Sequence, residues 1–315
     1  MLQIAFVGMG SIGKRHLGNV CAYLTEAERA FSIDLYRSGK GSPLDAEITG
    51  KIHRQFTLSE DTPVSGHYDV VFVTNPTALH YETIRRFAPA AGTMFIEKPV
   101  FDSPDLPLDG LGLSPEGVYY VACPLRYNPV LAYVREHIPC QEAHAVRAIC
   151  SSYLPDWRPG TDYRTCYSAH RDMGGGVDID LIHEWDYLTW LFGPVQTGFA
   201  IRNKLSQLEI DSYDTAVYIA QTERTAIELH LDYFGRKSIR QLQIFLPEET
   251  ILCDLLAGTV DYQASGAHIQ LNVERNGYQM AEIRHFFEIL DEKRPNDSGI
   301  PGALRVLRYA RGEFS

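Results

Sequence analysis

A glycine triplet near the start of the chain constrains the fold more than any other feature. Gly8, Gly10 and Gly13 follow the apolar run at residues 2–7 and precede a segment with helical periodicity. In a strand–turn–helix unit, this spacing permits a tight turn, close approach of backbone N–H groups to a phosphate, and tight helix packing. The helix N-terminus adds a partial positive charge. We therefore predict a dinucleotide pyrophosphate site, against the alternative of a glycine-rich turn without a ligand.

The composition narrows the class of protein. The chain has 315 residues, a net charge of -11 and 45% hydrophobic residues, which is typical of a globular protein of about two domains. Its acidic balance argues against a nucleic-acid partner. No apolar stretch approaches the roughly 18 residues of a membrane span, and no signal peptide is recognisable. The six cysteines lack C-x-x-C spacing, so we expect reduced thiols, no metal site and a cytoplasmic protein.

The first 122 residues alternate strand and helix patterns. This alternation predicts a doubly wound parallel sheet, a Rossmann domain, whose ligand lies beyond the carboxyl ends of the strands. The expected strands are residues 4–7, 31–36, 68–74, 93–97 and 117–122, and the expected helices are residues 12–24 and 77–87.

Residues 123–315 have a different pattern, in which alternating segments follow one another closely and predict an open, mostly antiparallel sheet. The overall prediction is an α/β fold with a dinucleotide-binding domain at 1–122 and an α+β substrate domain at 123–315. We expect helices to cover one face of the second sheet and the other face to bury against another subunit in a homodimer or homotetramer. The expected strands are 143–154, 195–204, 214–221, 226–234, 239–246, 250–255 and 268–274, with helices at 176–192, 278–292 and 302–310.

The end of the second strand decides between NAD and NADP. An acid about 20 residues beyond the glycines would bind the ribose 2′-hydroxyl of NAD. The expected strand instead ends near Arg37 and Ser38, which can hold a 2′-phosphate. Asp34 becomes the NAD acid if the strand ends one turn earlier. The sequence therefore favours NADP and leaves NAD as the alternative.

Four segments, in order, resemble the glucose–fructose oxidoreductase/inositol dehydrogenase/MocA (Gfo/Idh/MocA) family. They are residues 7–13, Thr-Asn-Pro-Thr-Ala-Leu-His at 74–80, Glu-Lys-Pro at 97–99, and the glycine-led segment 174–186 with its His-Glu-Trp-Asp end. Arg-Tyr-Asn-Pro at 126–129 and Asp-Thr-Ala at 214–216 are also similar. The resemblance covers nearly the whole chain. It implies a Rossmann domain followed by an open-faced α/β domain, a tightly held nicotinamide cofactor, and sugar or polyol substrates.

The cofactor candidates follow from the glycine turn, the strand ends and this resemblance. The resemblance implies that Glu97 contacts the cofactor, with an ordinary surface carboxylate as the alternative. His80 is expected either to line the nicotinamide side or to serve as a capping or buried residue. The complete set is Gly8, Gly10, Ser11, Ile12, Gly13, Arg37, Ser38, Thr74, Asn75, Pro76, His80 and Glu97.

Lys98, Asp180 and His183 are the catalytic candidates. An ammonium just beyond a strand end can polarise a hydroxyl or carbonyl, although an ordinary surface lysine is the alternative. Asp180 and His183 are three residues apart on one expected helix, so the carboxylate can orient an imidazole that acts as a general base. A surface pair or a buried histidine is the alternative. In the family, the acid lies four residues before the histidine, a position that Ile179 occupies here. Asp178 can compete with Asp180 for the role of this acid.

A loop rich in Trp, Tyr, Arg and Asp follows the first strand of the second domain. Aromatic faces pack on sugar C–H surfaces, and arginines bind anionic groups. We therefore expect an anionic substrate such as a nucleotide sugar, sugar acid or sialic-acid-like sugar, with a structural lid or dimer contact as the alternative. The substrate candidates are Arg126, Trp157, Arg158, Tyr163, Arg164, Tyr167 and Arg171.

These expectations combine into an NAD(P)-dependent sugar oxidoreductase. His183 exchanges the hydroxyl proton and Lys98 stabilises the alkoxide while hydride passes to or from nicotinamide. Both side chains must then meet at the same nicotinamide ring. The alternatives are a non-catalytic cofactor-binding regulator, which would lack the lysine or the histidine, and a chiefly structural oligomer. His16, His53 and His67 are expected at the surface.

Overall fold

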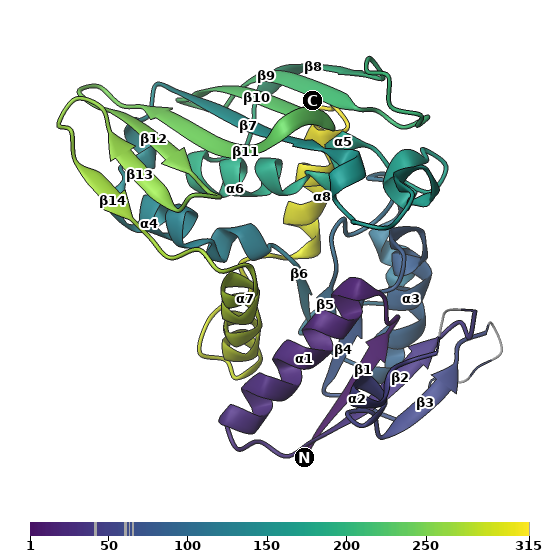
Figure 1. The fold of residues 1–315 in the computed structure, drawn as a ribbon. Coiled ribbons are helices and arrows are strands. Elements are labelled where there is room, and N and C mark those ends of the chain that lie inside the picture. The colour runs from purple at the N-terminus through teal and green to yellow at the C-terminus, as the bar shows by residue number, and fades with distance from the viewer. Residues whose placement is uncertain (41–42, 60–61, 63, 65, 315) are drawn as a thin grey trace. The chain divides into compact units, whose positions relative to one another are not determined.

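The chain divides into two compact units in the computed structural model, which describes residues 1–40, 43–59, 62, 64 and 66–314 (Figure 1). The first unit comprises Met1–Ala122 and Gln279–Leu304, and the second comprises Cys123–Tyr278 and Arg305–Ser315. The break after Ala122 lies where the sequence pattern changes. The segment Gln279–Leu304, which we had expected in the second domain, groups with the first unit instead.

The first unit is built on a six-stranded parallel sheet with the order β3-β2-β1-β4-β5-β6. The order reverses between β1 and β4, which confirms the doubly wound arrangement and marks the crevice where such sheets bind ligands. Strand β3 was not predicted from the sequence, because Phe56 is its one apolar residue. The strands are β1 Leu2–Val7, β2 Phe31–Arg37, β3 Arg54–Thr57, β4 Val70–Val73, β5 Thr93–Ile96 and β6 Val118–Val121.

Helices cover both faces of this sheet. Figure 1 shows α1 (Ser11–Glu26) on one face and α3 (His80–Phe87) on the other. Helix α7 (Arg275–Leu290) packs beside α1, and the ring of its Phe286 contacts the sheet residues Phe72 and Phe95. These aromatic contacts explain why this late segment belongs to the first unit. The short elements are α2 Ala46–Thr49, η1 Thr77–Leu79, η2 Ala88–Ala90 and η3 Leu108–Leu111.

The second unit contains an eight-stranded sheet with the order β14-β13-β12-β11-β7-β10-β9-β8. Strands β7 and β10 are parallel, and the other neighbouring pairs are antiparallel, which confirms the predicted mostly antiparallel sheet. The short β13 was absent from the prediction. The strands are β7 Ala145–Tyr153, β8 Thr197–Asn203, β9 Thr215–Gln221, β10 Ala226–Asp232, β11 Phe234–Phe245, β12 Thr250–Asp254, β13 Thr259–Tyr262 and β14 His268–Gln270.

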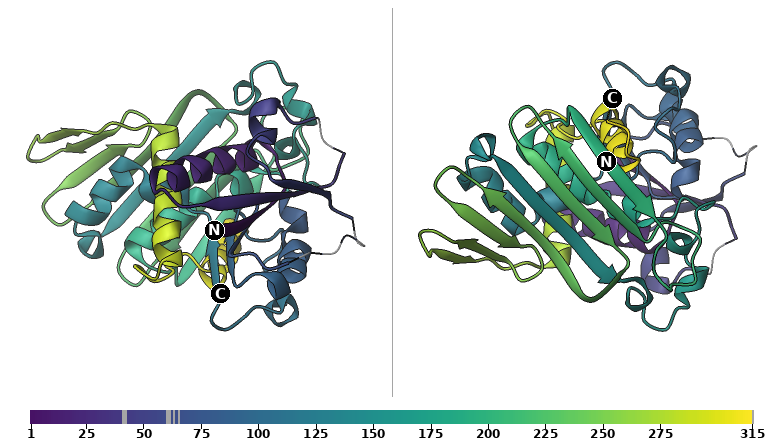
Figure 2. Two further views of the ribbon diagram at one scale, coloured as in Figure 1. Left: turned by 90° about the horizontal axis from the view of Figure 1, so that it is seen from below. Right: turned by 90° about the horizontal axis from the view of Figure 1, so that it is seen from above.

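The helices of the second unit lie on one face of its sheet. Helices α4 (Pro129–His137) and α6 (His183–Phe192) cover that face (Figure 1), and no helix of the described residues crosses the opposite face in the right-hand view of Figure 2. On strands β8 and β9, Phe199 and Ile219 are paired across the ladder and are 65% and 57% exposed. The remaining elements are η4 Pro124–Tyr127, η5 Cys140–Glu142, η6 Leu154–Asp156, η7 Tyr163–Thr165, η8 Tyr167–Ala169, α5 Val177–Asp180 and α8 Ile300–Ala310.

Two further expectations concern membranes and cysteines. Within the described segments, no helix has the length and hydropathy needed to cross a membrane. All six cysteines are free and buried. Burial raises the pKa of the Cys150 and Cys253 thiols to about 12, so these side chains serve as small core residues.

Candidate functional site

The glycine turn leaves backbone groups open to a ligand. Gly8 has a φ of +96°, and a Cβ there would lie 2.6 Å from the Asn75 backbone. A Cβ on Gly13 would lie 2.9 Å from the Thr74 hydroxyl, whereas one on Gly10 would meet no atom of the described residues within 4 Å, apart from those of its chain neighbours. Gly10 is the N-cap of α1, and no side chain caps this helix. The turn therefore fits a pyrophosphate, because its open space adjoins the positive end of a helix.

The end of β4 supports this turn from the side. The Thr74 hydroxyl donates to the Gly8 carbonyl at 3.0 Å, and Asn75 Nδ2 donates to the Thr83 hydroxyl at 2.7 Å. These hydrogen bonds stabilise the backbone of the glycine turn and of the segment beside it. The side chains of Thr74 and Asn75 thus have structural partners of their own.

His80 occupies the buried alternative of its two predicted positions. Its Nε2 lies 2.9 Å from the Asn75 carbonyl oxygen, and its Nδ1 lies 3.1 and 3.2 Å from the carbonyl oxygens of Pro99 and Val100. Burial lowers the pKa of His80, although the surrounding carbonyl oxygens act in the opposite direction. The imidazole therefore joins the end of β4 to the segment after Lys98.

Asp34 was expected to bind the ribose of NAD only if strand β2 ended one turn before Arg37, and the strand does not end there. The strand continues to Arg37, and Asp34 lies inside it. Its carboxylate is buried, receives two hydrogen bonds from Arg54 at 2.6 and 3.0 Å, and accepts another from the Tyr68 hydroxyl at 2.8 Å. Asp34 is therefore an internal ion-pair partner, and Arg37 and the exposed Ser38 follow at the strand end.

Glu97 and Lys98 follow β5 at the same carboxyl edge of the sheet as the glycine turn. Glu97 is buried, and its Oε1 lies 2.5 Å from Nε2 of His16. Burial by itself would raise the pKa of Glu97, but the hydrogen bond with His16 and the charge of Lys98 help to hold it below its usual range. Lys98 is half-buried, and its backbone N–H donates to Glu97 Oε2 at 3.1 Å.

The prediction of a surface position for His16 is wrong, since only 1% of this residue is exposed. The sequence itself contains the pattern that indicates a buried position for His16. His16 lies three residues after Gly13 and four before Val20, which both belong to the buried face of α1. Helical spacing therefore predicts an inward-facing residue at this position. By contrast, His53 and His67 are exposed, as expected.

The prediction of one helix carrying both Asp180 and His183 is also wrong. Helix α5 ends at Asp180, Leu181 leaves helical geometry with a ψ of 26°, and α6 begins at His183. The Asp180 carboxylate accepts a hydrogen bond from the buried Tyr233 hydroxyl at 2.6 Å. His183 is half-buried at the start of α6. The competing acid Asp178 is buried and paired with Arg202 at 2.9 Å.

Three of the substrate candidates gather around Asp180. Although Tyr167 is 42% exposed as a residue, desolvation of its hydroxyl raises the pKa, and the charge of Asp180 and a hydrogen bond to it act in the same direction. The Arg158 guanidinium lies 5.7 Å from the centre of the Tyr167 ring, and Trp157 packs edge-on against Tyr233 at 5.2 Å. Trp157, Arg158 and Tyr163 also line one pocket of this unit. Tyr167 of the aromatic loop thus interacts with the Asp180 carboxylate, whereas Trp157 and Arg158 contact the two tyrosines that bind it, Tyr233 and Tyr167.

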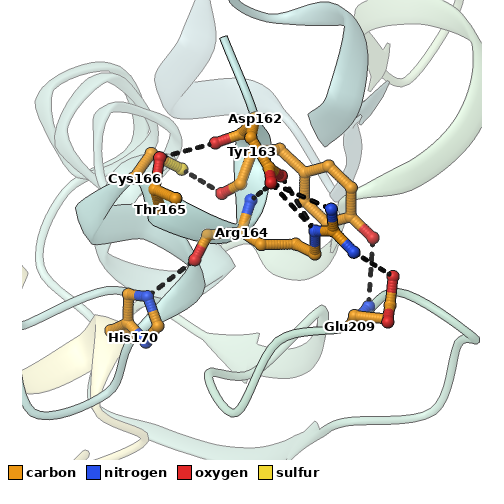
Figure 3. A network of polar contacts seen from close by, with 7 residues as sticks. All are labelled: Asp162, Tyr163, Arg164, Thr165, Cys166, His170 and Glu209. Carbon is orange, nitrogen blue, oxygen red and sulfur yellow. Dashed lines mark hydrogen bonds and ion pairs between the residues drawn. The ribbon is translucent and has the colours of Figure 1, made fainter.

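The remaining arginine candidates have protein partners. Figure 3 shows Arg164 bound to Asp162 at 2.9 Å and to Glu209 at 3.1 Å. In the same network, the Tyr163 hydroxyl accepts the Glu209 backbone N–H at 3.2 Å, and His170 Nε2 lies 2.7 Å from the Arg164 carbonyl oxygen (Figure 3). These contacts hold the loop together.

Arg126 and Arg171 are engaged in similar ways. Arg126 makes two hydrogen bonds to Asp186, at 2.6 and 3.0 Å. Arg171 stacks on the Tyr213 ring at 4.5 Å and donates to the Asp211 carbonyl at 3.2 Å. Of the four arginines predicted to bind substrate, Arg158 therefore lies against Tyr167, next to Asp180. The other three, Arg126, Arg164 and Arg171, are engaged with other protein groups.

Comparisons with curated proteins find two uncharacterized oxidoreductases. YrbE of Bacillus subtilis is 27% identical over 231 residues, which are 70% of this chain and 64% of that protein. The protein sll0816 of Synechocystis is 23% identical over 199 residues, which are 62% of this chain and 53% of that protein. The matches thus span between half and two thirds of the relatives' own lengths.

Solved structures with a similar fold include several sugar-type dehydrogenases. UDP-N-acetylglucosamine 3-dehydrogenase from Acidithiobacillus ferrooxidans has a TM-score of 0.76 at 19% identity, covering 98% of this chain and 95% of that one. Levoglucosan dehydrogenase in complex with NADH has a TM-score of 0.82 at 15% identity, with the same coverage. WlbA from Bordetella pertussis, in complex with NADH and UDP-GlcNAcA, has a TM-score of 0.75 at 17% identity, covering 98% and 93%. At these identities the comparison shows the fold.

The family comparison agrees with the glycine turn and the parallel sheet. Residues 2–106 match the family GFO_IDH_MocA, described as an oxidoreductase family with an NAD-binding Rossmann fold. This range contains the glycine turn, the end of β4, and the Glu97–Lys98 pair. Residues 2–106, which lie in the first unit, therefore match the Gfo/Idh/MocA oxidoreductase family.

Proposed function

We propose that this protein is an NAD(P)-dependent dehydrogenase or reductase of a sugar, sugar acid or nucleotide sugar. The observation that carries the proposal is the open glycine turn at the uncapped N-terminus of α1, with Lys98 at the same sheet edge. Several dehydrogenases of sugar-type substrates share the fold, which supports the substrate class. When bound, the nicotinamide would supply the hydride donor or acceptor.

The roles of the protein side chains follow from their chemistry. Lys98 would polarise the substrate oxygen and stabilise negative charge that develops there. His183 would take the hydroxyl proton in oxidation and return it in reduction. Asp180 and the surrounding Trp157 and Arg158 would orient the sugar, because a carboxylate, an aromatic face and a guanidinium together match hydroxyl, C–H and anionic groups.

Variants of Lys98 and His183 test these roles in assays of reduced-nicotinamide absorbance with a panel of neutral sugars, sugar acids and nucleotide sugars. We expect Lys98→Ala and His183→Ala each to lose at least about a hundredfold in kcat while cofactor still binds. If both side chains act on one substrate, the double variant should lose little more than the worse single variant. Lys237→Ala and His144→Ala, at exposed positions, are the matched controls.

The same assays separate the enzyme from a regulator. Full turnover by either variant would refute the role assigned to that residue. Tight cofactor binding without turnover on any member of the panel would favour the alternative, a non-catalytic cofactor-binding regulatory protein of the same fold.

For the cofactor, we propose NADP, held through its 2′-phosphate by Arg37 and Ser38. The proposal is supported by the internal pairing of Asp34 with Arg54, which leaves Arg37 and Ser38 at the strand end. The family description and the bound complexes of similar structures name NAD or NADH, so NAD is the competing assignment. Fluorescence titration with NADPH and NADH decides between them. Arg37→Ala should weaken NADPH selectively, and tighter NADH binding by the unaltered protein would refute NADP.

We also propose a homodimer or homotetramer formed through the uncovered sheet face. The pairs Phe199–Ile219 and Ile201–Val217 place apolar side chains side by side on β8 and β9. An exposed apolar patch of this kind favours a protein partner. Light scattering coupled to size-exclusion chromatography should show an oligomer that Ile219→Glu dissociates, whereas Glu82→Gln, at an exposed glutamate on α3 of the first unit, leaves it intact. A monomeric unaltered protein would contradict the proposal.

A further inference from the structure

A buried pair of polar side chains lies beneath the carboxyl edge of the first sheet. His16 Nε2 lies 2.5 Å from Glu97 Oε1, and the two side chains are 1% and 11% exposed. The imidazole packs edge-on against Phe95 with ring centres 4.9 Å apart. The second carboxylate oxygen of Glu97 accepts the Lys98 backbone N–H at 3.1 Å. A continuous chain of contacts therefore runs from α1 through the carboxylate to the backbone of Lys98.

The surroundings of His16 define the charge of this pair. Its Nδ1 is buried and has no hydrogen-bond partner among the described residues. A proton on Nδ1 would therefore leave an unpaired N–H among aromatic rings, which is costly. The favoured arrangement places a proton on Nε2, where it is donated to Glu97. The Glu97 carboxylate carries the negative charge of the pair.

The sheet order places this charge in one half of the cofactor site. In a doubly wound sheet, each βαβαβ half binds one mononucleotide, and the pyrophosphate lies at the switch point. The glycine turn between β1 and α1 marks that switch, and β2 and β3 belong to the adenosine half. Glu97 and Lys98 follow β5, which belongs to the other half. His16 therefore connects the pyrophosphate helix to the strand end on the nicotinamide side.

We propose that His16 and Glu97 form a positioning pair for the nicotinamide half of the bound dinucleotide. His16 holds the Glu97 carboxylate, the carboxylate holds the Lys98 backbone, and its negative charge favours the cationic, oxidised ring over the neutral, reduced ring. The inference rests on the proposed function, because it requires a bound nicotinamide. It changes the expected role of Glu97 from direct cofactor contact to support of the residue that follows it.

Calorimetric titrations of the intact protein with three ligands distinguish binding by the nicotinamide half of the site from binding by the adenosine half. NADH and NAD⁺ contain the nicotinamide, whereas ADP-ribose contains only the adenosine diphosphate and a ribose. Their 2′-phosphorylated counterparts replace them if the protein binds these more tightly. His16→Leu removes the donor, His16→Gln keeps an N–H at a similar reach, and Glu97→Gln keeps the shape of the carboxylate without its charge. The control is Glu82→Gln, at an exposed glutamate on α3 of the same unit.

We expect His16→Leu to weaken NADH binding about tenfold and ADP-ribose binding less than about twofold. His16→Gln should recover most of the lost affinity. Glu97→Gln should weaken NAD⁺ about tenfold more than NADH, because it removes a charge that distinguishes the two rings. Glu82→Gln should match the unaltered protein with all three ligands.

Two results would overturn the inference. Equal losses for NADH and ADP-ribose in folded His16→Leu would show that the pair only stabilises the unit. An unchanged ratio of NAD⁺ to NADH affinity in Glu97→Gln would remove its electrostatic role. Thermal melts identify variants that do not fold. If His16→Leu does not fold, the single variants His16→Gln and Glu97→Gln test the inference. Failure of the proposed function has a different signature, because the unaltered protein would then bind none of the three ligands.

Discussion

The glycine turn of the first unit and the aromatic loop of the second were both predicted to bind ligand, but they are built in opposite ways. In the turn, the backbone makes the site, and the position of Gly10 leaves its surroundings open. In the loop, most charged side chains already have partners, as Arg164 has in Asp162 and Glu209. The difference teaches that a motif based on backbone geometry predicts a site more directly than a collection of charged side chains.

The same contrast holds for the two candidate carboxylates. Glu97 in the first unit is held by an imidazole, and Asp180 in the second by the hydroxyl of Tyr233. Neither partner is adjacent in sequence. In both units, therefore, the group that controls a predicted catalytic or cofactor residue comes from a distant element.

The largest effect is expected at Gly10. Gly10→Val should weaken cofactor binding about a hundredfold, or about 2.7 kcal/mol, because its side chain would occupy the space beside the helix N-terminus. The melting temperature should change little, since the added Cβ meets open space among the described residues beyond its chain neighbours. Gly18→Val is the control, because a Cβ at that position of α1 also meets open space. Unaltered affinity in Gly10→Val would show that the turn is not the binding site.

Arg126 should behave as a structural residue. Arg126→Met should lower the free energy of unfolding in urea by about 2 kcal/mol, because it leaves the mostly buried Asp186 carboxylate unpaired. The two side chains are only 12% and 15% exposed. The control Arg147→Met breaks the exposed pair with Glu228 and should cost less than about 1 kcal/mol. A variant with full stability but a raised KM would instead make Arg126 a substrate residue.

Arg158 and Arg164 offer a comparison within the loop. With an anionic substrate, Arg158→Gln should raise KM about tenfold, or about 1.4 kcal/mol, whereas Arg164→Gln should raise it less than about threefold. The reason is that Arg164 is bound to two carboxylates, whereas Arg158 flanks Tyr167 beside Asp180. Steady-state kinetics with the substrate found in the sugar panel measure both values. Equal effects of the two substitutions would remove the distinction between them.

The smallest effect concerns the pH dependence of stability through His80. Burial lowers its folded-state pKa below 6.5, so the unfolded state binds the proton more readily. Its contribution to stability is therefore complete above pH 6.5 and is lost as the pH falls through the folded-state pKa, with a slope of at most about 1.4 kcal/mol per pH unit. His80→Gln should flatten the dependence of urea unfolding between pH 7 and 5. The exposed control His53→Gln should keep the slope, and equal slopes in all three proteins would contradict this assignment.

Much of the first unit could be predicted because its signals are local. The glycine spacing, the fully apolar β4 and the Glu-Lys-Pro segment identify a strand, a turn or a strand end from neighbouring residues alone. The break between Asp180 and His183 was missed, because the apolar pattern of that segment continues across it and helical periodicity alone does not reveal a change in backbone geometry at Leu181.

The sequence alone determined the two-part architecture, the doubly wound sheet and the dinucleotide turn. These depend on hydrophobic periodicity and on the backbone freedom of glycine, both of which act over a few residues. Only the tertiary structure decided the partner of each buried charge. His16 meets Glu97 across 81 residues, and Arg126 meets Asp186 across 60. Burial makes an unpaired charge costly in every fold, but chain topology decides which opposite charge lies within reach.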